Sequence, residues 1–353
     1  AALGFVFVTI LLDVIGFGLI VPVFPKLLEA FEGGDTARAA EVYGVFAAVW
    51  AGVQLFASPL LGALSDRYGR RPVLLLSTLG LGLDYVLMAL APTTAWLLVG
   101  RILNGVTAAS FSTASAYVAD VTPPEKRAAA FGITGAAFGI GFVLGPALGG
   151  LLGELGPRVP FWAAAVVALL NFAWGLFVLP ESLPPERRAP FDLARANPFG
   201  ALRLYRENPA LLGLAGVFGL YHVAHYVLPS TFVLYAGARF GWGEREVGLT
   251  FALVGVTSIV VQAGLVRGAV ARLGETGAML AGLLCGAAGL ALYALAPTPG
   301  WFLLGVVVYA PAGLFTPGVQ SRMTRLVDPR QQGGLQGANG AVMGLSGLVG
   351  PIV

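Results

Sequence analysis

Three ionisable side chains interrupt long apolar stretches of this sequence: Asp13, Asp84 and Arg101. An ionised group in the middle of a bilayer costs at least a few kcal/mol, so such a residue is usually paired or functional. Asp13 has no basic residue one helical turn away, and burial favours the protonated carboxyl group, so Asp13 is the leading candidate for a proton carrier. Asp84 and Arg101 fall at similar depths on neighbouring antiparallel segments. They are equally consistent with a structural ion pair and with a role in proton coupling.

Two histidines, His222 and His225, lie three residues apart in the stretch YHVAHYVLP and therefore share one helix face. They are interpreted either as polar contacts to a neighbouring helix or as a titrating pair, because histidine changes charge near neutral pH. Two such ligands without a nearby carboxylate disfavour a metal site. The single cysteine, Cys285, excludes a disulfide framework and a thiolate cluster.

Aromatic and amide side chains within the apolar stretches are candidates for a ligand cavity, because such sites are mostly apolar with a few polar groups. The alternative is that they face lipid or pack in the core. Besides the two histidines, the candidates are Phe17, Trp50, Gln54, Tyr117, Phe142, Tyr221, Tyr226, Gln262 and Tyr309.

The composition requires these residues to be carried by membrane-spanning helices. The chain has 353 residues, of which 57% are hydrophobic and 11% charged, with a mean hydropathy of +0.82; a soluble domain has about 25% charged residues. A span needs about 20 apolar residues, so the length allows about ten to twelve helices. Apolar runs predict an all-α membrane protein with spans near 3–25, 43–64, 73–91, 95–119, 130–152, 160–179, 210–233, 246–266, 276–296 and 300–320, and an eleventh from Gly334.

The basic residues predict an orientation. With a cytoplasmic amino end, fifteen of the 21 basic residues fall in inside loops and five in outside loops, as the positive-inside rule requires. The first apolar stretch has no basic leader and is interpreted as helix one, not as a signal peptide.

A polar segment rich in Pro and Arg, residues 181–209, divides the chain into two halves, 1–180 and 210–353. A shift of 205 residues places Gly69 on Gly274 and Pro146 on Pro351. Parallel repeats of this kind are typical of transporters with a substrate site between the halves. We therefore expect two six-helix halves, with about eleven of twelve helices present here.

Three motifs carry a family resemblance: GALSDRYGRRPV at 62–73, GRILNGVTAA at 100–109 and GITGAAFGIGFVLGPALGG at 132–150. They resemble signature motifs of the major facilitator superfamily. The stretches LLDVIGFGLIVPVFP, LLLSTLGLGLDYVLMAL and ARFGWGEREVG resemble its tetracycline/proton antiporter branch. The resemblance implies a monomeric, multi-pass protein of the bacterial inner membrane, without cofactor or nucleic-acid partner, that exchanges protons for amphipathic drug-like small molecules.

The first motif follows the second predicted span at the cytoplasmic side. One interpretation is simple positive-inside anchoring. The resemblance implies a latch in which Asp66 faces the amino end of helix eleven and Arg70 pairs with Asp120. The second half has VRGAVARLGET at this place, without the acid, so one strong latch is expected. The latch residues are Gly62, Asp66, Arg67, Gly69, Arg70, Arg71 and Asp120.

The third motif leaves one helix face almost bare of side chains, which lets helix backbones approach closely in lipid. Ordinary helix packing explains part of this pattern, and the resemblance adds that it is typical of antiporters. The second half repeats it with Gly340, Gly344, Gly350 and Pro351. The motif residues are Gly135, Gly139, Gly141, Gly145, Pro146 and Gly149.

The sequence departs from that branch in its second half. The branch carries an acid in helix nine and a histidine in helix eight, whereas AGLLCGAAGLALYAL has no acid and GVTSIVVQAG has Ser258. An acid in the first half alone suits exchange of a proton for a neutral or cationic amphiphile. The absence of a GxxxxGK[ST] motif excludes a P-loop ATP drive. The alternatives are a proton-coupled nutrient symporter and a non-transporting membrane receptor; an intramembrane enzyme is disfavoured.

Overall fold

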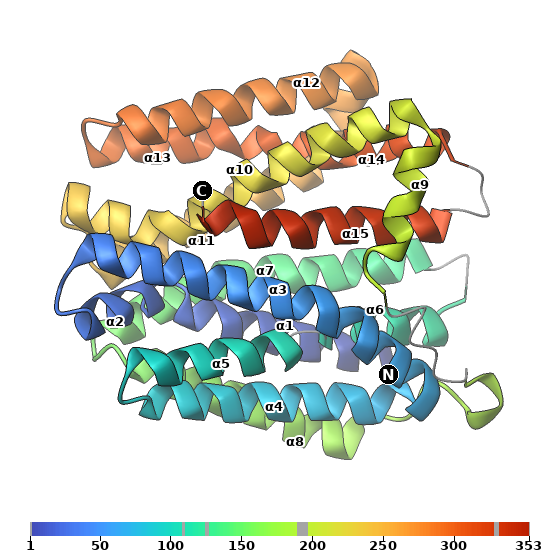
Figure 1. The fold of residues 1–353 in the computed structure, drawn as a ribbon, viewed down its shortest axis with the longest axis horizontal. Coiled ribbons are helices and arrows are strands. Elements are labelled where there is room, and N and C mark those ends of the chain that lie inside the picture. The colour runs from blue at the N-terminus through green and yellow to red at the C-terminus, as the bar shows by residue number, and fades with distance from the viewer. Residues whose placement is uncertain (1, 108–109, 124–126, 189–196, 328–331, 353) are drawn as a thin grey trace.

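The computed structural model describes residues 2–107, 110–123, 127–188, 197–327 and 332–352. The described residues form a bundle of long helices that run roughly along one common axis, with no strand among them (Figure 1). Within this part of the chain, eight segments are long and apolar enough to cross a membrane: Gly4–Phe31, Thr36–Tyr68, Arg70–Leu90, Ile133–Gly153, Val159–Val178, Pro209–Pro229, Thr276–Leu295 and Pro299–Arg325. The protein is therefore an all-α, multi-pass membrane protein.

The described residues of the first half form eight α-helices. They are α1 (Ala2–Ile20), α2 (Phe24–Phe31), α3 (Thr36–Tyr68), α4 (Arg70–Leu90), α5 (Thr94–Thr107), α6 (Ser110–Val121), α7 (Arg127–Gly153) and α8 (Val159–Val178). The predicted span 3–25 ends at Ile20, because the chain turns at 21–23, where Pro22 has no N–H to continue the helix. The predicted span 95–119 corresponds to α5 and α6, and the junction at 108–109 lies outside the described residues.

The second half begins after a short helix in the polar segment, α9 (Arg203–Glu207). Its longer helices are α10 (Pro209–Phe240), α11 (Glu244–Val260), α12 (Val266–Leu295), α13 (Pro299–Tyr309), α14 (Phe315–Arg325) and α15 (Gln332–Val349). Two boundaries differ from the prediction. A π-helical turn at Val261–Leu265 carries α11 directly into α12, and the chain reverses at Gly274, whose φ of 69° favours glycine. The predicted span 300–320 contains a 3₁₀ turn at Ala310–Leu314, where Pro311 cannot donate a helical hydrogen bond.

Each half has its own apolar core. In the first half, α1 packs on α7 and α8, and α4 packs on α5 and α8; in the second half, α12 packs on α13 and α14, and α10 on α15. Figure 1 shows α1–α8 on one side of the bundle and α10–α15 on the other. Contacts between the halves come mainly from two pairs of helices, α3 with α15 and α7 with α11. These two pairs are where the functional residues must be examined.

Candidate functional site

The glycine-rich face of α7 packs directly on α1. A Cβ atom added at Gly141 would lie 2.8 Å from Cβ of Val14, and one at Gly145 would lie 2.8 Å from Cα of Gly18. Real Cβ atoms do not approach other carbons so closely. These glycines are therefore required for the α1–α7 contact inside the first half.

A second face of α7 forms one of the two contacts between the halves, here called the α7–α11 seam. A Cβ at Gly150 would lie 2.5 Å from the Glu244 carbonyl oxygen, and one at Gly255 would lie 2.5 Å from Cγ2 of Val143. Gly248 faces the carbonyl oxygen of Pro146. The glycine motif thus serves packing within one half and packing between the halves at the same time.

The other contact between the halves is the α3–α15 seam. A Cβ at Gly44 would lie 2.5 Å from the Pro351 carbonyl oxygen, and one at Gly344 would lie 2.7 Å from Cδ1 of Leu55. The shift of 205 residues maps α7 onto α15 and maps α3 onto α11. The two seams are therefore the same contact made twice, once by each half.

Both seams are closed at only one end of the bundle. We call the end that holds α2 and the α10–α11 turn the α2 end, and the end that holds α9 the linker end (Figure 1). The tight glycines above lie in the central and α2-end parts of the seams. Toward the linker end, a Cβ would meet nothing within 4 Å at Gly62, Gly135, Gly264, Gly268 and Gly340. The halves therefore touch at the α2 end and are apart at the linker end.

A cross-half polar contact closes the α2 end. The Lys26 ammonium on α2 donates to the Trp242 carbonyl oxygen at 3.0 Å and lies 3.7 Å from Oε1 of Glu244. Beside it is a pocket of about 300 Å³ lined by Lys26, Glu29 and Thr36 and by α10 residues. This pocket lies at the α2 end, so it is not the central cavity expected from the sequence.

The linker touches both halves. The ring of Phe199 packs edge-on against Phe56 of α3, with centroids 5.8 Å apart. Tyr205 on α9 donates from its hydroxyl to Oδ1 of Asn339 on α15 at 2.7 Å. Burial raises the pKa of Tyr205 to about 12, so this hydroxyl keeps its proton at neutral pH.

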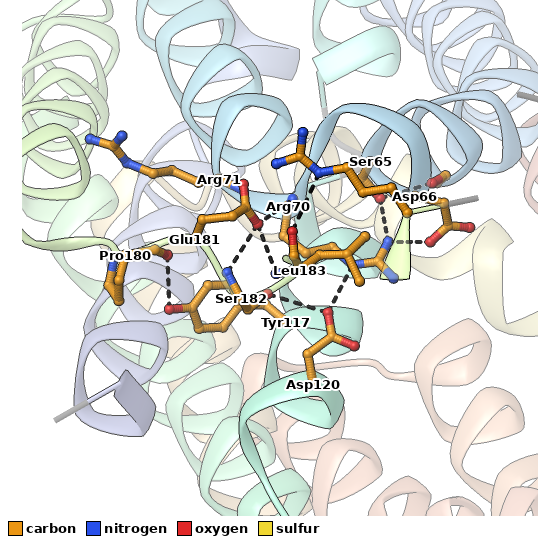
Figure 2. A network of polar contacts seen from close by, with 12 residues as sticks. Ser65, Asp66, Arg70, Arg71, Tyr117, Asp120, Pro180, Glu181, Ser182 and Leu183 are labelled. Atoms are coloured by element: carbon orange, nitrogen blue, oxygen red, sulfur yellow. Dashed lines mark hydrogen bonds and ion pairs between the residues drawn. The ribbon is translucent and has the colours of Figure 1, made fainter. Parts of the chain in front are cut away.

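Arg70 is the centre of the motif at residues 62–73 (Figure 2). Its Nε lies 3.0 Å from Oδ2 of Asp120, which confirms the expected pair, and its Nη1 lies 2.5 Å from Oδ1 of Asp66. Nη1 also donates to Oγ of Ser65 at 2.6 Å. The expected contact of Asp66 with the amino end of helix eleven stays a prediction, because that end adjoins residues 328–331, which lie outside the described residues. Arg67 is exposed and stacks over the Tyr68 ring at 5.4 Å.

Glu181 completes this network and was not predicted. Gly69 precedes α4 with a φ of 107° and has no side chain to cap the helix. Glu181 takes that role: its Oε1 accepts from the Arg70 N–H at 2.8 Å, and its Oε2 from the Arg71 N–H at 3.3 Å (Figure 2). A carboxylate at a helix amino end is favourable. The acid directly after the sixth span was the available signal.

Tyr117 belongs to the same region, so its assignment to a cavity is wrong. Its side chain is completely buried in the core of the first half, and its hydroxyl donates to the Pro180 carbonyl oxygen at 3.1 Å. Arg71 of α4 donates to the Leu176 carbonyl oxygen of α8 at 2.9 Å. Together, the Tyr117 and Arg71 bonds connect the end of α8 to α6 and α4. A buried hydroxyl needs such a partner, which explains the position without a ligand.

Asp84 is 1% exposed. Arg101 is near enough to interact with it electrostatically, but no direct ion pair joins the two side chains among the described residues. Oδ2 of Asp84 accepts from Nδ2 of Asn104 at 3.0 Å. The Arg101 guanidinium instead lies 4.5 Å from the centroid of the Phe24 ring, with Nη2 3.5 Å from Sδ of Met88. The ion-pair interpretation is therefore wrong for this conformation, because a ring face and a thioether take up the cation.

Asn104 links Asp84 to Trp50 and was not predicted. Its Oδ1 accepts from Nε1 of Trp50 at 2.8 Å. The Trp50 ring stacks on Phe17, with centroids 6.2 Å apart, and both rings are half-buried. A lone amide in an apolar span was the signal that sequence reasoning passed over.

Asp13 is half-buried on α1 and is held by another amide. Asn171 of α8 donates from Nδ2 to Oδ1 of Asp13 at 2.8 Å and to the Thr9 carbonyl oxygen at 3.1 Å. Tyr85 lies close enough to Asp13, Asp84 and Arg101 to interact electrostatically with each. The three candidate charges thus belong to one polar region inside the first half.

The histidines and tyrosines of the second half form an aromatic row. The rings of Tyr221 and His225 stack at 6.1 Å, and those of His225 and Tyr309 at 6.3 Å. His225 Nδ1 lies 2.9 Å from the Tyr309 hydroxyl, and Tyr221 donates to the Ala312 carbonyl oxygen at 3.0 Å. His222 is 5% exposed, with Nδ1 2.8 Å from the Phe218 carbonyl oxygen. Of the two histidines, His225 contacts a polar side chain of another helix, and His222 bonds the backbone of its own helix.

The remaining cavity candidates lie on four different helical elements. Phe142 is half-buried and packs against the cores of both halves. Tyr226 packs against Gly347 and Gly350 of the second half. Gln54 is half-buried, and Gln262 is exposed in the π-helical turn.

Two helical halves that close at one end and part at the other, with carboxylates inside the first half, define a multi-pass membrane transporter. Known proteins agree with this class. The sequence profile of the Major Facilitator Superfamily matches residues 6–351, and the chain therefore belongs to that family. It is a transporter and not an enzyme.

Similar proteins cover nearly all of the chain. It is 40% identical to the class C tetracycline resistance protein of Escherichia coli over 346 residues, 98% of this chain and 86% of that protein. It is 34% identical to the class B protein of Escherichia coli over 349 residues, 97% and 85% of the two chains. Among solved structures, the human organic anion transporter MFSD10 matches with a TM-score of 0.74 and 26% identity, covering 99% and 92%. The nucleoside transporter NupG, at 14% identity, shares the fold, with a TM-score of 0.80 and coverage of 100% and 89%.

Proposed function

We propose that this protein exports amphipathic, drug-like small molecules in exchange for protons by alternating access. The observation that carries the proposal is the pair of intramembrane carboxylates, Asp13 and Asp84, inside a two-half fold whose seams are closed at one end only. Buried acids of this kind mark proton pathways in transporters. The full-length similarity to tetracycline resistance proteins supports export as the direction.

The proposed orientation places the linker end in the cytoplasm of a bacterium, together with the amino terminus. The excess of basic residues in the loops at that end supports this orientation. The conformation described here is then open to the cytoplasm, with Lys26 and the α2-end parts of both seams closing the outer side. The protein would act as a monomer, because each seam already pairs one half with the other.

We assign three roles to the polar groups. Asp13 is the proton carrier, because it is half-buried inside the first half beside the uncharged amide of Asn171; Asp84, with Arg101 nearby, is the second proton-coupling group. Trp50, Phe17 and the aromatic row of the second half supply stacking surfaces for the substrate. Arg70 and its carboxylates form the latch at the linker end, which holds α3, α4 and α6 together while the halves rock.

The substrate panel must include tetracycline as well as cationic amphiphiles. The relatives' names point to tetracycline, whereas the acid-free ninth helix and Ser258 in place of a histidine point to a cation or a neutral amphiphile. These alternatives are separated by direct measurement.

The experiment uses the full-length protein in proteoliposomes with an imposed pH gradient. It records movement of tetracycline, ethidium and Hoechst 33342 for the native protein and for Asp13→Asn, with Glu41→Gln at an exposed position as the control. Movement against the proton flow that is lost only in Asp13→Asn supports the proposal. Movement with the protons would indicate an importer, and a lack of movement for every compound would favour a non-transporting receptor.

A further inference from the structure

We propose that Asn104 and Trp50 connect substrate binding to the charge of Asp84, with Trp50 as the substrate-contacting residue and Asn104 as the positioning residue. This inference rests on the proposed exchange of a substrate for protons. It adds the side chains through which binding of the substrate would change the affinity for the proton. It also assigns a flat aromatic amphiphile as the substrate class.

The surroundings of Asp84 make Asn104 its decisive neighbour. Oδ2 accepts from Asn104, whereas Oδ1 has no hydrogen-bond partner among the described residues. A Cβ at Gly100 would lie 2.8 Å from Oδ1, so the α5 backbone covers that side. A buried carboxylate with one donor depends strongly on that donor.

Other ionisable groups around Asp84 are few. Arg101 on α5 is near but engaged by Phe24 and Met88, and α8 has no ionisable side chain. Tyr85 on the same helix has a buried hydroxyl that lies close to the Asn104 side chain and to Asp84. The more distant groups on packed elements are Tyr43, Asp13 on α1, Glu41 near the α2 end, and Asp66 and Asp120, which pair with Arg70 at the linker end.

The polarity of the Asn104 amide is set by Trp50. An indole N–H can only donate, so the oxygen of Asn104 must face Trp50 and its NH₂ group must face Asp84. This orientation favours the charged carboxylate. If the indole moves away, the amide is free to rotate and to present its oxygen to Asp84, an arrangement that only a protonated carboxyl group can satisfy. The position of the Trp50 ring therefore selects the charge of Asp84.

Trp50 is placed to respond to a substrate. Its ring is half-buried and stacks on Phe17, and the next residue, Ala51, packs on Gly347 across the α3–α15 seam. A flat aromatic molecule that stacks on Trp50 would hold the indole against Asn104. Substrate binding would then favour the ionised form of Asp84, and weakening of the Trp50–Asn104 bond on substrate release would favour uptake of a proton, as exchange requires. Substrate and proton affinity are then linked reciprocally.

The test uses Trp50→Phe, which keeps an aromatic ring but removes the N–H, and Asn104→Leu, which removes both bonds with a side chain of similar size. Trp96→Phe, at an exposed position on α5, is the matched control. Purified full-length protein in weakly buffered detergent receives ethidium, or tetracycline as a second probe. The proton uptake or release that follows is recorded between pH 5 and 9, with Asp84→Asn as the reference without the carboxyl group.

We expect the pH midpoint of the Asp84-dependent proton exchange to rise by about one unit in Asn104→Leu, a tenfold change in proton affinity, because the carboxylate loses its donor. Trp50→Phe should also raise this pH midpoint, and it should raise the KM of transport more than it lowers kcat. Trp96→Phe should leave the midpoint and the kinetic constants unchanged. If Trp50→Phe and any folded Asn104→Leu protein keep the native midpoint, the relay is refuted, even where melting temperatures fall. If the native protein exchanges protons with neither probe and transports neither, the proposed function is refuted together with the relay.

Discussion

Gly150→Ala should shift the protein away from the conformation described here. The new Cβ would lie 2.5 Å from the Glu244 carbonyl oxygen, whereas an ordinary carbon–oxygen approach is about 3.3–3.6 Å. The α7–α11 seam would therefore have to widen by roughly 1 Å at its α2 end. Overpacking of this size costs about 1–3 kcal/mol. Because the strain is relieved when the α2 end opens, the ratio of the two states should change by about 5- to 150-fold.

Gly145→Ala is the matched control on the same helix. Its Cβ would lie 2.8 Å from Cα of Gly18, inside the first half, and that contact does not change when the halves rock. We expect a lower melting temperature for Gly145→Ala without a change in the ratio of conformations. Both variants add one methyl group to α7, but only Gly150→Ala is expected to change the ratio of conformations.

The assay is a distance measurement between spin labels at the α2 end. Glu41→Cys on α3 and Leu295→Cys at the end of α12 are exposed positions on opposite halves, in a Cys285→Ala background that removes the single native cysteine. Gly150→Ala should populate longer distances. An unchanged distribution in Gly150→Ala, or an equal change in Gly145→Ala, would refute the assignment of this glycine to a seam that opens.

Three further predictions concern single contacts. Lys26→Ala should move the same spin-label distribution less than Gly150→Ala, by under about fivefold, because a partly exposed contact contributes about 0–1 kcal/mol; a larger effect would make Lys26 the main outer closure. Arg70→Lys should lower the melting temperature and transport together, because lysine cannot bond Asp120 and a second acceptor in the same fork geometry; native behaviour would show that charge alone suffices. Tyr205→Phe should destabilise the protein by about 1–2 kcal/mol by leaving Asn339 without its donor, measured by thermal unfolding; a neutral result would show that water replaces the hydroxyl.

The sequence predicted the class of fold because the length of an apolar segment and the spacing of its glycines can be recognised without knowing which helices it contacts. The Gly-rich stretch of α7 and its repeat in α15 could be read directly, since close helix contact leaves few alternatives to glycine. The Arg70–Asp120 pair was expected from the family resemblance, and the two side chains lie 3.0 Å apart.

Contacts that depend on the packing angle of helices could not be predicted. Arg101 faces Phe24 and not Asp84, because α2 folds back over the first half, and no residue pattern indicates that return. Glu181 reaches α4 across a gap of 111 positions. Asn104 and Asn171 were missed for a different reason: an uncharged amide in an apolar run looks like a minor variation until its partners are known.

The equivalence of the two seams gives the molecule a property that a symmetric homodimer lacks. In a homodimer, every interface substitution appears twice, so its effect on opening is doubled. Here a change at Gly248, which faces the Pro146 carbonyl oxygen, leaves the equivalent contact of Gly44 with Pro351 untouched. A single substitution can therefore change the free-energy difference between the open and closed forms by half as much as it would in a homodimer. Each seam can be altered separately, while the two-fold arrangement of the halves is kept.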